Sequence, residues 1–178
     1  TILGKAEFMN PGQSVKDRAG LFIVRDAEER GRLAPGGVIV EGTAGNTGIG
    51  LAMVCAQLGV RAHFVSSDAF SAEKLQTMRA FGATLDVLAC EGGKITAGLM
   101  QRMDARVREL TSEPGTFWTR QFTNADNPLG YAPMADEIVD ALGGRVDEFV
   151  MMVGTAGCFS GNAARLKDAG LPFTREAA

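Results

Sequence analysis

The stretch "VIVEGTAGNTGIGLA", residues 38–52, carries the strongest signal for the fold of this chain. Three β-branched residues open it, and a turn with glycines at positions 42, 45 and 48 follows before an apolar helical pattern begins. A strand that passes through a glycine-rich turn into a helix is the first half of a βαβ unit. The same order returns in "FVMMVGTAGCFSGNAA", residues 149–164. The pattern therefore predicts parallel strands that alternate with helices.

The rest of the chain keeps this alternation. Strands are expected at residues 37–42, 61–67, 83–89 and 146–154, with a further extended stretch at 116–122. Helices are expected at residues 14–30, 46–59, 71–82 and 94–110, from residue 131 or 133 onward, and after the turn at 154–161. Helices of this length between short strands indicate an α/β fold with a parallel sheet. Helical periodicity is interrupted between Thr111 and Asn127, which marks the expected boundary between two lobes.

Composition narrows the class of protein. The chain has 178 residues, 46% of them hydrophobic, and a net charge of −3, which suits one globular domain or part of a two-lobed one. Because it has no basic stripe and no apolar run of about 18 residues, neither a nucleic-acid partner nor a membrane span is expected. Cys55, Cys90 and Cys158 form no Cys-x-x-Cys pair, so no metal site and no disulfide framework is expected. A reducing, cytoplasmic setting is the expectation for such a chain.

The two glycine-rich turns, residues 42–48 and 154–161, are candidate binding sites. In open α/β sheets, ligands bind at the carboxyl ends of the strands, where such turns lie. Glycine lets a ligand approach the backbone closely, and the first N–H groups of the next helix attract an anion. Neither turn contains Gly-x-Gly-x-x-Gly, and the chain has no Gly-x-x-x-x-Gly-Lys, which disfavours a nucleotide-binding domain. Glycines that merely close tight turns are the alternative.

A lysine stands where "NPGQSVKDRAG", residues 10–20, changes from a Pro-Gly turn to a helix. The start of a helix is electropositive and disfavours a charged lysine, as does partial burial. Lys16 is therefore either an ordinary surface lysine or one whose pKa is lowered so that its neutral amine acts as a nucleophile. Ser14 and Asp17 have residue types suited to a capping box at this helix start.

Four stretches together carry a resemblance to a known family: "NPGQSVKDRAG", "EGTAGNTGIGLA", "QFTNADNP" and "VGTAGCFSG". Their order and spacing resemble the fold-type II pyridoxal phosphate enzymes, in the branch of cysteine synthase and cystathionine β-synthase. The resemblance implies a two-lobed architecture of parallel-sheet βαβ units, of which this chain is a fragment that is incomplete at both ends. Residues 1–123 would form mainly the smaller N-terminal lobe, and residues 124–178 would begin the larger one.

The resemblance also implies roles for individual residues. Lys16 matches the lysine that bonds covalently to the cofactor, and Asn46 matches the asparagine that hydrogen-bonds the ring hydroxyl. The residues that match the substrate-carboxylate site are Thr43, Ala44, Gly45, Thr47 and Gln121. The residues that match the phosphate cup are Gly154, Thr155, Ala156, Gly157 and Cys158. Three of these positions depart from the family pattern, because Ala44 replaces a serine, Ala156 replaces a glycine and Cys158 replaces a hydroxyl residue. Cys158 could alternatively be a redox-sensitive thiol of low pKa at a helix start.

The activity implied by the resemblance is a pyridoxal phosphate-dependent β-replacement on a serine-derived amino acid. O-acetylserine and sulfide, or another thiol, would be the substrates and cysteine the product, in a homodimer when the chain is complete. A β-elimination or dehydratase activity is an alternative, although "TAGNTG" favours the synthase branch. A non-catalytic homologue that binds a metabolite or a partner protein is another alternative, which an intact Lys16 disfavours.

Overall fold

The structure is a computed structural model that describes residues 1–43 and 45–170. Its first part is built on a four-stranded parallel sheet with the strand order β3-β2-β1-β4. The strands are β1 (Val38–Gly42), β2 (Arg61–Ser67), β3 (Thr84–Leu88) and β4 (Thr116–Trp118). In the centre, Val38 of β1 is paired with Arg61 of β2 on one side and with Thr116 of β4 on the other. The predicted α/β fold with a parallel sheet is confirmed.

Six α-helices and two short 3₁₀ helices complete the described part of the chain. They are η1 (Glu7–Met9), α1 (Lys16–Glu29), α2 (Asn46–Leu58), α3 (Ala72–Ala80), α4 (Ala97–Leu110), η2 (Pro128–Tyr131), α5 (Ala132–Ala141) and α6 (Gly157–Asp168). α2 ends at Gly59, whose φ of 69° is a left-handed conformation suited to glycine. α4 begins after Thr96, whose hydroxyl accepts the Leu99 amide at 3.1 Å. None of these helices is long and apolar enough to cross a membrane.

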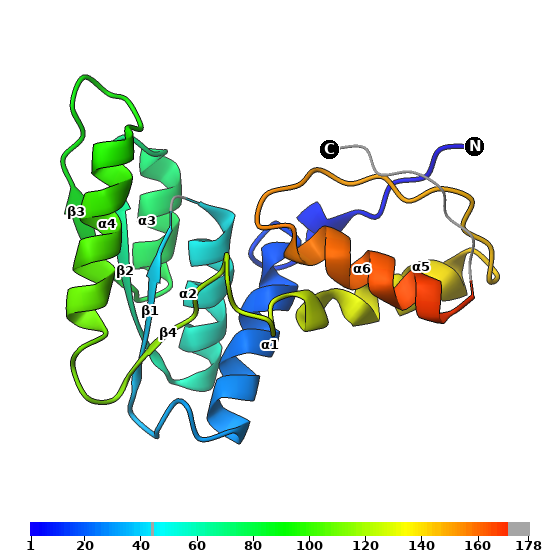
Figure 1. Ribbon diagram of the computed structural model, residues 1–178, viewed down its shortest axis with the longest axis horizontal. Coiled ribbons are helices and arrows are strands. Elements are labelled where there is room, and N and C mark those ends of the chain that lie inside the picture. The colour runs from blue at the N-terminus through cyan, green and yellow to red at the C-terminus, as the bar shows by residue number, and fades with distance from the viewer. Residues whose placement is uncertain (44, 171–178) are drawn as a thin grey trace.

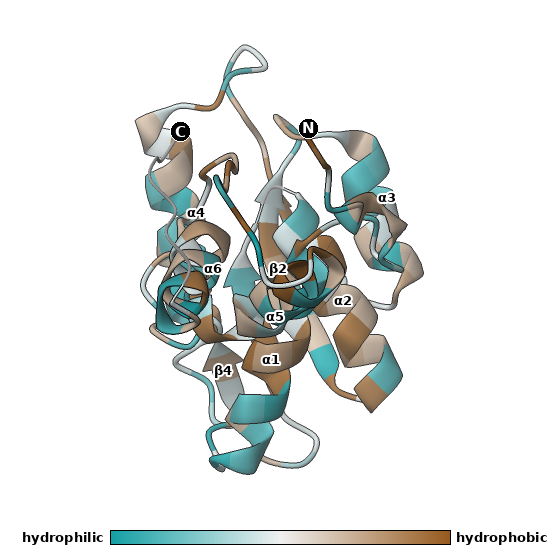
Figure 2. Ribbon diagram, turned by 90° about the vertical axis from the view of Figure 1, so that its right-hand side faces the viewer, coloured by the Kyte–Doolittle hydropathy of each residue, from teal (hydrophilic) through white to brown (hydrophobic). Residues whose placement is uncertain are grey.

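The sheet carries helices on both faces. Successive residues of a strand point to opposite faces of the sheet. Ile39 accordingly packs in the cluster with α2 and α3, and the next residue, Val40, packs in the cluster with α4. Phe64 and Val65 of β2 divide in the same way. α2 is hydrophobic around much of its surface, which is coloured brown in Figure 2, because it lies between other elements.

The second part of the molecule is helical and meets the sheet part through α1 (Figure 1). Ile23 of α1 belongs to one buried cluster with Tyr131 and Met134, and Val24 of the same helix belongs to the sheet's cluster with α2. α1 therefore contributes to both cores. The division into lobes at residues 123 and 124 stays a prediction.

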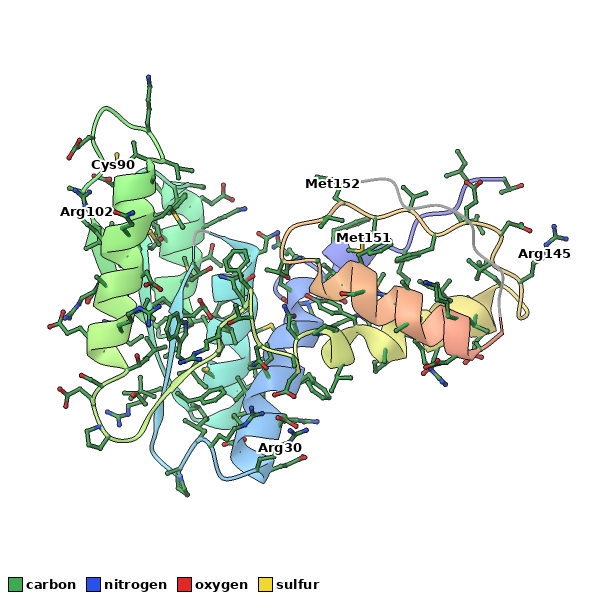
Figure 3. All side chains as sticks on the ribbon, viewed as in Figure 1. Arg30, Cys90, Arg102, Arg145, Met151 and Met152 are labelled. Carbon is green, nitrogen blue, oxygen red and sulfur yellow. The ribbon has the colours of Figure 1, made fainter. Side chains whose placement is uncertain are left out.

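The segment at residues 146–154 differs from its prediction. It runs along α6 without strand structure, as seen near the labels of Met151 and Met152 in Figure 3. Phe149 is buried, whereas Val150 and Met152 are 65% and 90% exposed. A strand requires a neighbour that exchanges backbone hydrogen bonds with it, and no strand lies beside this segment among the described residues. The strand expected at 146–154 is wrong for this reason, although its apolar composition suited a strand.

Candidate active site

A small cavity lies where the first turn of α1 meets α2 and the segment that leads into η2. Its polar lining comes from parts of the chain that are far apart in sequence: Lys16, Thr47, Gln121, Asn127, Tyr131 and Thr155. Its apolar walls include Ala19, Ile23 and Leu51. The fold therefore brings Lys16 together with Gln121 and with one residue from each of the two glycine-rich turns.

Lys16 is the first residue of α1 and is partly buried. Its amide donates to Ser14 Oγ at 3.2 Å, whereas the Asp17 carboxylate accepts the amide of Gly12 at 2.6 Å. In the predicted capping box, the Asp17 carboxylate would accept the Ser14 amide. It accepts the Gly12 amide instead, so this part of the prediction is wrong. Burial raises the pKa of the Asp17 carboxyl. These contacts hold the backbone from which the Lys16 side chain extends.

Two glycines bring α1 and α2 into backbone contact beside Lys16. A Cβ at Gly50 would lie 2.9 Å from the Lys16 carbonyl oxygen, and one at Gly20 would lie 3.0 Å from the Gly50 carbonyl carbon. The two helices can approach this closely only because neither position carries a side chain. The approach places Lys16 beside Thr47, in the first turn of α2.

The first glycine-rich turn is shaped by its own threonine. Thr43 is 2% exposed, and its hydroxyl accepts the amides of Gly48 at 3.0 Å and Gly45 at 3.4 Å. Asn46 is exposed and does not line the Lys16 cavity. Ala44 lies outside the described residues. Of the residues expected to bind the substrate carboxylate in this turn, Thr47 lines the cavity. The Thr43 hydroxyl oxygen instead accepts hydrogen bonds within the turn.

The second glycine-rich turn leads into α6. Thr155 lines the cavity, and Gly157 is the first residue of the helix. Ala156 has a φ of 63°, so this position does require the left-handed conformation that glycine adopts more easily. The first amides of a helix have no partner within it, which leaves donors for an anion at this turn.

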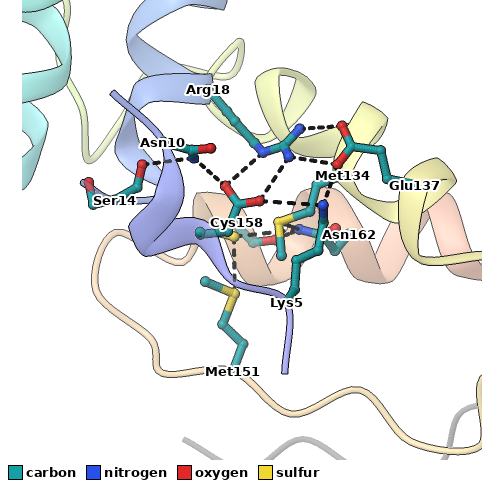
Figure 4. Close-up of polar contacts among 10 residues, drawn as sticks. Lys5, Asn10, Ser14, Arg18, Met134, Glu137, Met151, Cys158 and Asn162 are labelled. Carbon is teal, nitrogen blue, oxygen red and sulfur yellow. Dashed lines mark hydrogen bonds and ion pairs between the residues drawn. The ribbon is translucent and has the colours of Figure 1, made fainter. Parts of the chain in front are cut away.

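Cys158 points away from the turn and into the helical core. Its side chain is buried, and its Sγ lies 3.0 Å from Met151 Sδ (Figure 4). Burial raises the pKa of the thiol to about 12. Burial of the thiol disfavours the alternative of a reactive thiol with a low pKa, although Cys158 lies in the first turn of α6.

Arg18 of α1 lies in a cluster of charged side chains with Lys5, Glu7 and Glu137 (Figure 4). The Arg18 guanidinium donates to Glu7 through Nε and Nη2, each at 2.8 Å, and to Glu137 of α5 through Nη1 and Nη2 at 2.8 and 2.7 Å. Lys5 Nζ lies 2.5 Å from Glu137. Hydrogen bonds from Arg18 and Lys5 lower the pKa of Glu137 to about 2. The cluster ties the N-terminal segment and α5 to the helix that carries Lys16.

Sequence reasoning missed Glu41, which lies at the end of β1 and is 3% exposed. Its carboxyl accepts the Thr119 hydroxyl, the Gln121 amide at 3.1 Å and the Gly42 amide at 2.9 Å. Burial raises its pKa. The available signal was a single charged residue in the otherwise apolar stretch "VIVEG", since a buried carboxyl requires partners.

Asn127 and Tyr131 were also missed, and they bear on whether the cavity suits pyridoxal phosphate. Tyr131 is fully buried, and its hydroxyl and Asn127 Oδ1 have no hydrogen-bond partner in the structure. Buried polar atoms are rarely left in this state, so two such residues lining one cavity with Lys16 fit a site for a polar ligand. A lysine amine for an aldehyde and helix-start amides for a phosphate match the cofactor's chemistry. Among the described residues, no group of three His, Cys, Asp or Glu could hold a metal ion.

The fold and the site define a fold-type II pyridoxal phosphate enzyme, in which a lysine at a helix start lies between two glycine-rich turns. Residues 1–175 match the family model described as "Pyridoxal-phosphate dependent enzyme", and the chain belongs to this family. Cysteine synthase 1 of Neurospora crassa is 42% identical over 168 residues, which are 94% of this chain and 44% of the relative. The O-acetylserine dependent cystathionine beta-synthase of Bacillus subtilis is 40% identical over 169 residues, 94% of this chain and 53% of the relative.

Solved structures give the same result. The O-acetylserine dependent cystathionine beta-synthase of Helicobacter pylori matches with a TM-score of 0.86 and 37% identity over 97% of this chain and 55% of that one. O-ureido-L-serine synthase matches with a TM-score of 0.84 and 41% identity over 97% of this chain and 53% of that one. The chain thus spans about half the length of the relatives it matches.

Proposed function

We propose that the full-length protein catalyses a pyridoxal phosphate-dependent β-replacement on a serine-derived amino acid, with O-acetylserine and sulfide as substrates and cysteine as product. The observation that carries the proposal is the cavity in which Lys16 meets Gln121, Thr47 and Thr155. The names of the relatives support it, since they include cysteine synthases and an O-acetylserine dependent enzyme.

The residues divide into those that hold the cofactor and those that hold the substrate. Lys16 Nζ would bond to the cofactor aldehyde, and Asn46 would reach its ring hydroxyl. The turn formed by Gly154, Thr155, Ala156, Gly157 and Cys158 would bind the phosphate, with Cys158 contributing its backbone amide because its thiol is buried. The substrate carboxylate would lie against Thr43, Gly45, Thr47 and Gln121, with Ala44 proposed by its place in the sequence alone.

The chemistry requires a proton to move at the substrate Cα. When bound, the cofactor supplies the electron sink that makes the Cα–H acidic. As a neutral amine, Lys16 Nζ would take that proton as the general base. Gln121 and the turn around Thr47 orient the substrate by its carboxylate, and the apolar walls at Ile23 and Leu51 exclude water from the site.

Two finer features belong to the same proposal. We propose a homodimer as the assembly of the full-length protein, which sedimentation equilibrium would test. We also propose a cytoplasmic location, which agrees with three cysteines that are free in the structure. Cell fractionation followed by detection of the full-length protein would test the location.

The decisive test is the attachment of the cofactor to Lys16. Full-length protein loaded with pyridoxal phosphate should show a visible absorbance band, and borohydride reduction with peptide mapping should place the cofactor on Lys16. Lys16→Ala should lose both signals, whereas Lys94→Ala, which changes an exposed lysine, should keep them. A spectral change on adding O-acetylserine, followed by cysteine formation with sulfide, would support β-replacement. Release of pyruvate without cysteine would favour the elimination alternative, and a reduced adduct at another lysine would overturn the proposal.

A further inference from the structure

The end of β4 is held by side chains where the sheet's own hydrogen bonds stop. The last ladder contact is the Thr119 amide to the Val40 carbonyl at 3.2 Å. Arg120 then turns the chain away with a φ of 50°, an uncommon conformation outside glycine. Beyond this turn, the Gln121 amide donates to the Glu41 carboxyl at 3.1 Å, and Gln121 Nε2 donates to the Gly42 carbonyl at 3.0 Å. Glu41 thus continues the attachment of Gln121 to β1 after the strand pairing has ended.

A second set of contacts continues from Gln121 toward the other turn. Asn127 Nδ2 donates to the Gln121 carbonyl at 2.7 Å and to Thr155 Oγ1 at 3.1 Å. Asn127 is 3% exposed and rests on Gly157, where an added Cβ would lie 2.7 Å from Nδ2. One amide group therefore joins Gln121 to the start of the phosphate turn.

We propose that Glu41 and Asn127 are positioning residues that link the two glycine-rich turns through the Gln121 peptide. The link runs from Glu41 to the Gln121 N–H, and from the Gln121 carbonyl through Asn127 to Thr155. The positioning role rests on the proposed function, because it assigns the substrate carboxylate to Gln121 and the cofactor phosphate to the turn at Thr155.

Burial explains why the link can set a distance. Glu41, Gln121 and Asn127 are 3%, 8% and 3% exposed, so water cannot readily replace a lost partner. Substrate and cofactor bind to opposite ends of the link, and an error of about 1 Å between them is enough to slow a reaction strongly. A carboxyl suits the first position because its two oxygens accept from Thr119, Gln121 and Gly42 together.

The first experiment measures the link without relying on activity. In the full-length protein, hydrogen exchange should become about tenfold faster at the amides of Gln121 or Gly42 in Glu41→Gln, because an amide group offers one acceptor oxygen in place of two. Amides of β2 should change by less than about twofold. Glu109→Gln removes the same charge at a side chain that is 68% exposed and should leave these amides unchanged. Acceleration spread equally over β2, or none at all, would overturn the link.

The second experiment tests positioning. Glu41→Gln should raise the KM for O-acetylserine about tenfold with kcat within about threefold, while pyridoxal phosphate binding changes little. Asn127→Leu should weaken both substrate and cofactor binding by about tenfold, because Asn127 contacts both ends. In the double variant the effects on KM should be less than additive, since both changes break one link. Additive effects would overturn the proposal.

A third pair covers the case in which Glu41→Gln does not fold. Thr119→Val removes one donor to the Glu41 carboxyl, whereas Thr119→Ser keeps the hydroxyl. Only the valine variant should raise the KM, by about threefold. An unchanged KM despite faster exchange at Gln121 would make the link purely structural and overturn the positioning role. Failure of the cofactor to attach to Lys16 would instead refute the proposed function, and the exchange result would still stand.

Discussion

Two turns of this chain share the tetrapeptide Gly-Thr-Ala-Gly, at residues 42–45 and 154–157, and differ in what surrounds them. In both, the threonine hydroxyl accepts the amide two residues later at 3.4 Å. Thr43 is buried and also accepts the Gly48 amide, whereas Thr155 is half-buried and is contacted by Asn127 from another segment. The same four residues therefore form a turn held by β2 and by Gln121 after β1, and a turn held by Asn127 before α6.

Local sequence thus sets the hydroxyl-to-amide contact within each turn, and packing sets the contacts that each turn makes with other segments. The first turn follows a paired strand, so its start is already held by β2 at the sheet centre. The second follows an unpaired segment, and Asn127 supplies the contact that a neighbouring strand would otherwise give. Substitutions at equivalent positions should therefore have unequal effects.

The largest contrast is expected at the fourth residue of each turn. In Gly157→Ala, the new methyl group would lie 2.7 Å from Asn127 Nδ2 and displace a buried amide, so unfolding free energy should fall by about 3 kcal/mol. In Gly45→Ala, the methyl group would meet the flexible end of Lys74 at 3.2 Å, and the loss should be about 0.5 kcal/mol. Urea denaturation of both variants measures the contrast. Equal losses would show that the two turns are not packed differently.

The threonines should give the next contrast. Thr43→Val leaves the Gly48 amide, which lies in a buried contact, without its acceptor and should cost about 2 kcal/mol. Thr155→Val affects a half-buried hydroxyl and should cost about 1 kcal/mol. Thermal unfolding of each variant against its serine counterpart, which keeps the hydroxyl, separates the lost hydrogen bond from the lost methyl packing. A larger loss of stability in Thr155→Val than in Thr43→Val would contradict the interpretation that the first turn is the more buried of the two.

Acid should weaken the region that carries the second turn. The pKa of Glu137 is lowered from 4.5 to about 2, so its contribution is complete above pH 4.5 and is lost as the pH falls toward 2. Because the side chain is 44% exposed, solvent screening limits this contribution to about 1 kcal/mol. The unfolding free energy of the wild type should exceed that of Glu137→Gln by about 1 kcal/mol near neutral pH. This difference should become smaller as the pH falls toward 2. A pH-independent gap in denaturation free energy would contradict the prediction.

The smallest effect is expected at Ala156. Its φ of 63° is strained for alanine, so Ala156→Gly should raise the unfolding free energy by about 0.5 kcal/mol after the greater freedom of unfolded glycine is subtracted. Ala141→Gly, at the end of α5, is the matched control and should lower it by about 0.5 kcal/mol. Both changes can be followed by chemical denaturation, and the same sign in both would argue against strain at Ala156.

Most of the sheet part could be predicted from sequence because its signals are local. β1, β2 and β3 coincide closely with the expected strands, and α2 ends where Gly59 closes the helical pattern. Lys16 could be singled out because a cation at a helix start is locally unfavourable. The motifs around it identified the family, which the comparisons confirm.

Contacts between distant segments could not be predicted in the same way. The strand expected at 146–154 has the correct composition but no partner, and composition does not report on partners. Asn127 lies in a stretch whose resemblance was recognised, yet nothing local shows that its amide reaches both Gln121 and Thr155. Tyr131 reads as an ordinary helix-start residue until its buried hydroxyl is seen beside Lys16.

The amino-acid order alone determined the alternation of strands and helices, the two turns and the lysine, because each depends on conformational preferences within a few residues. Tertiary structure decided that Lys16, Gln121 and Thr155 share one cavity and that Glu41 and Asn127 connect its walls. The physical reason is that hydrogen bonds between buried groups depend on positions in space, which the chain acquires only when its helices and sheet pack together.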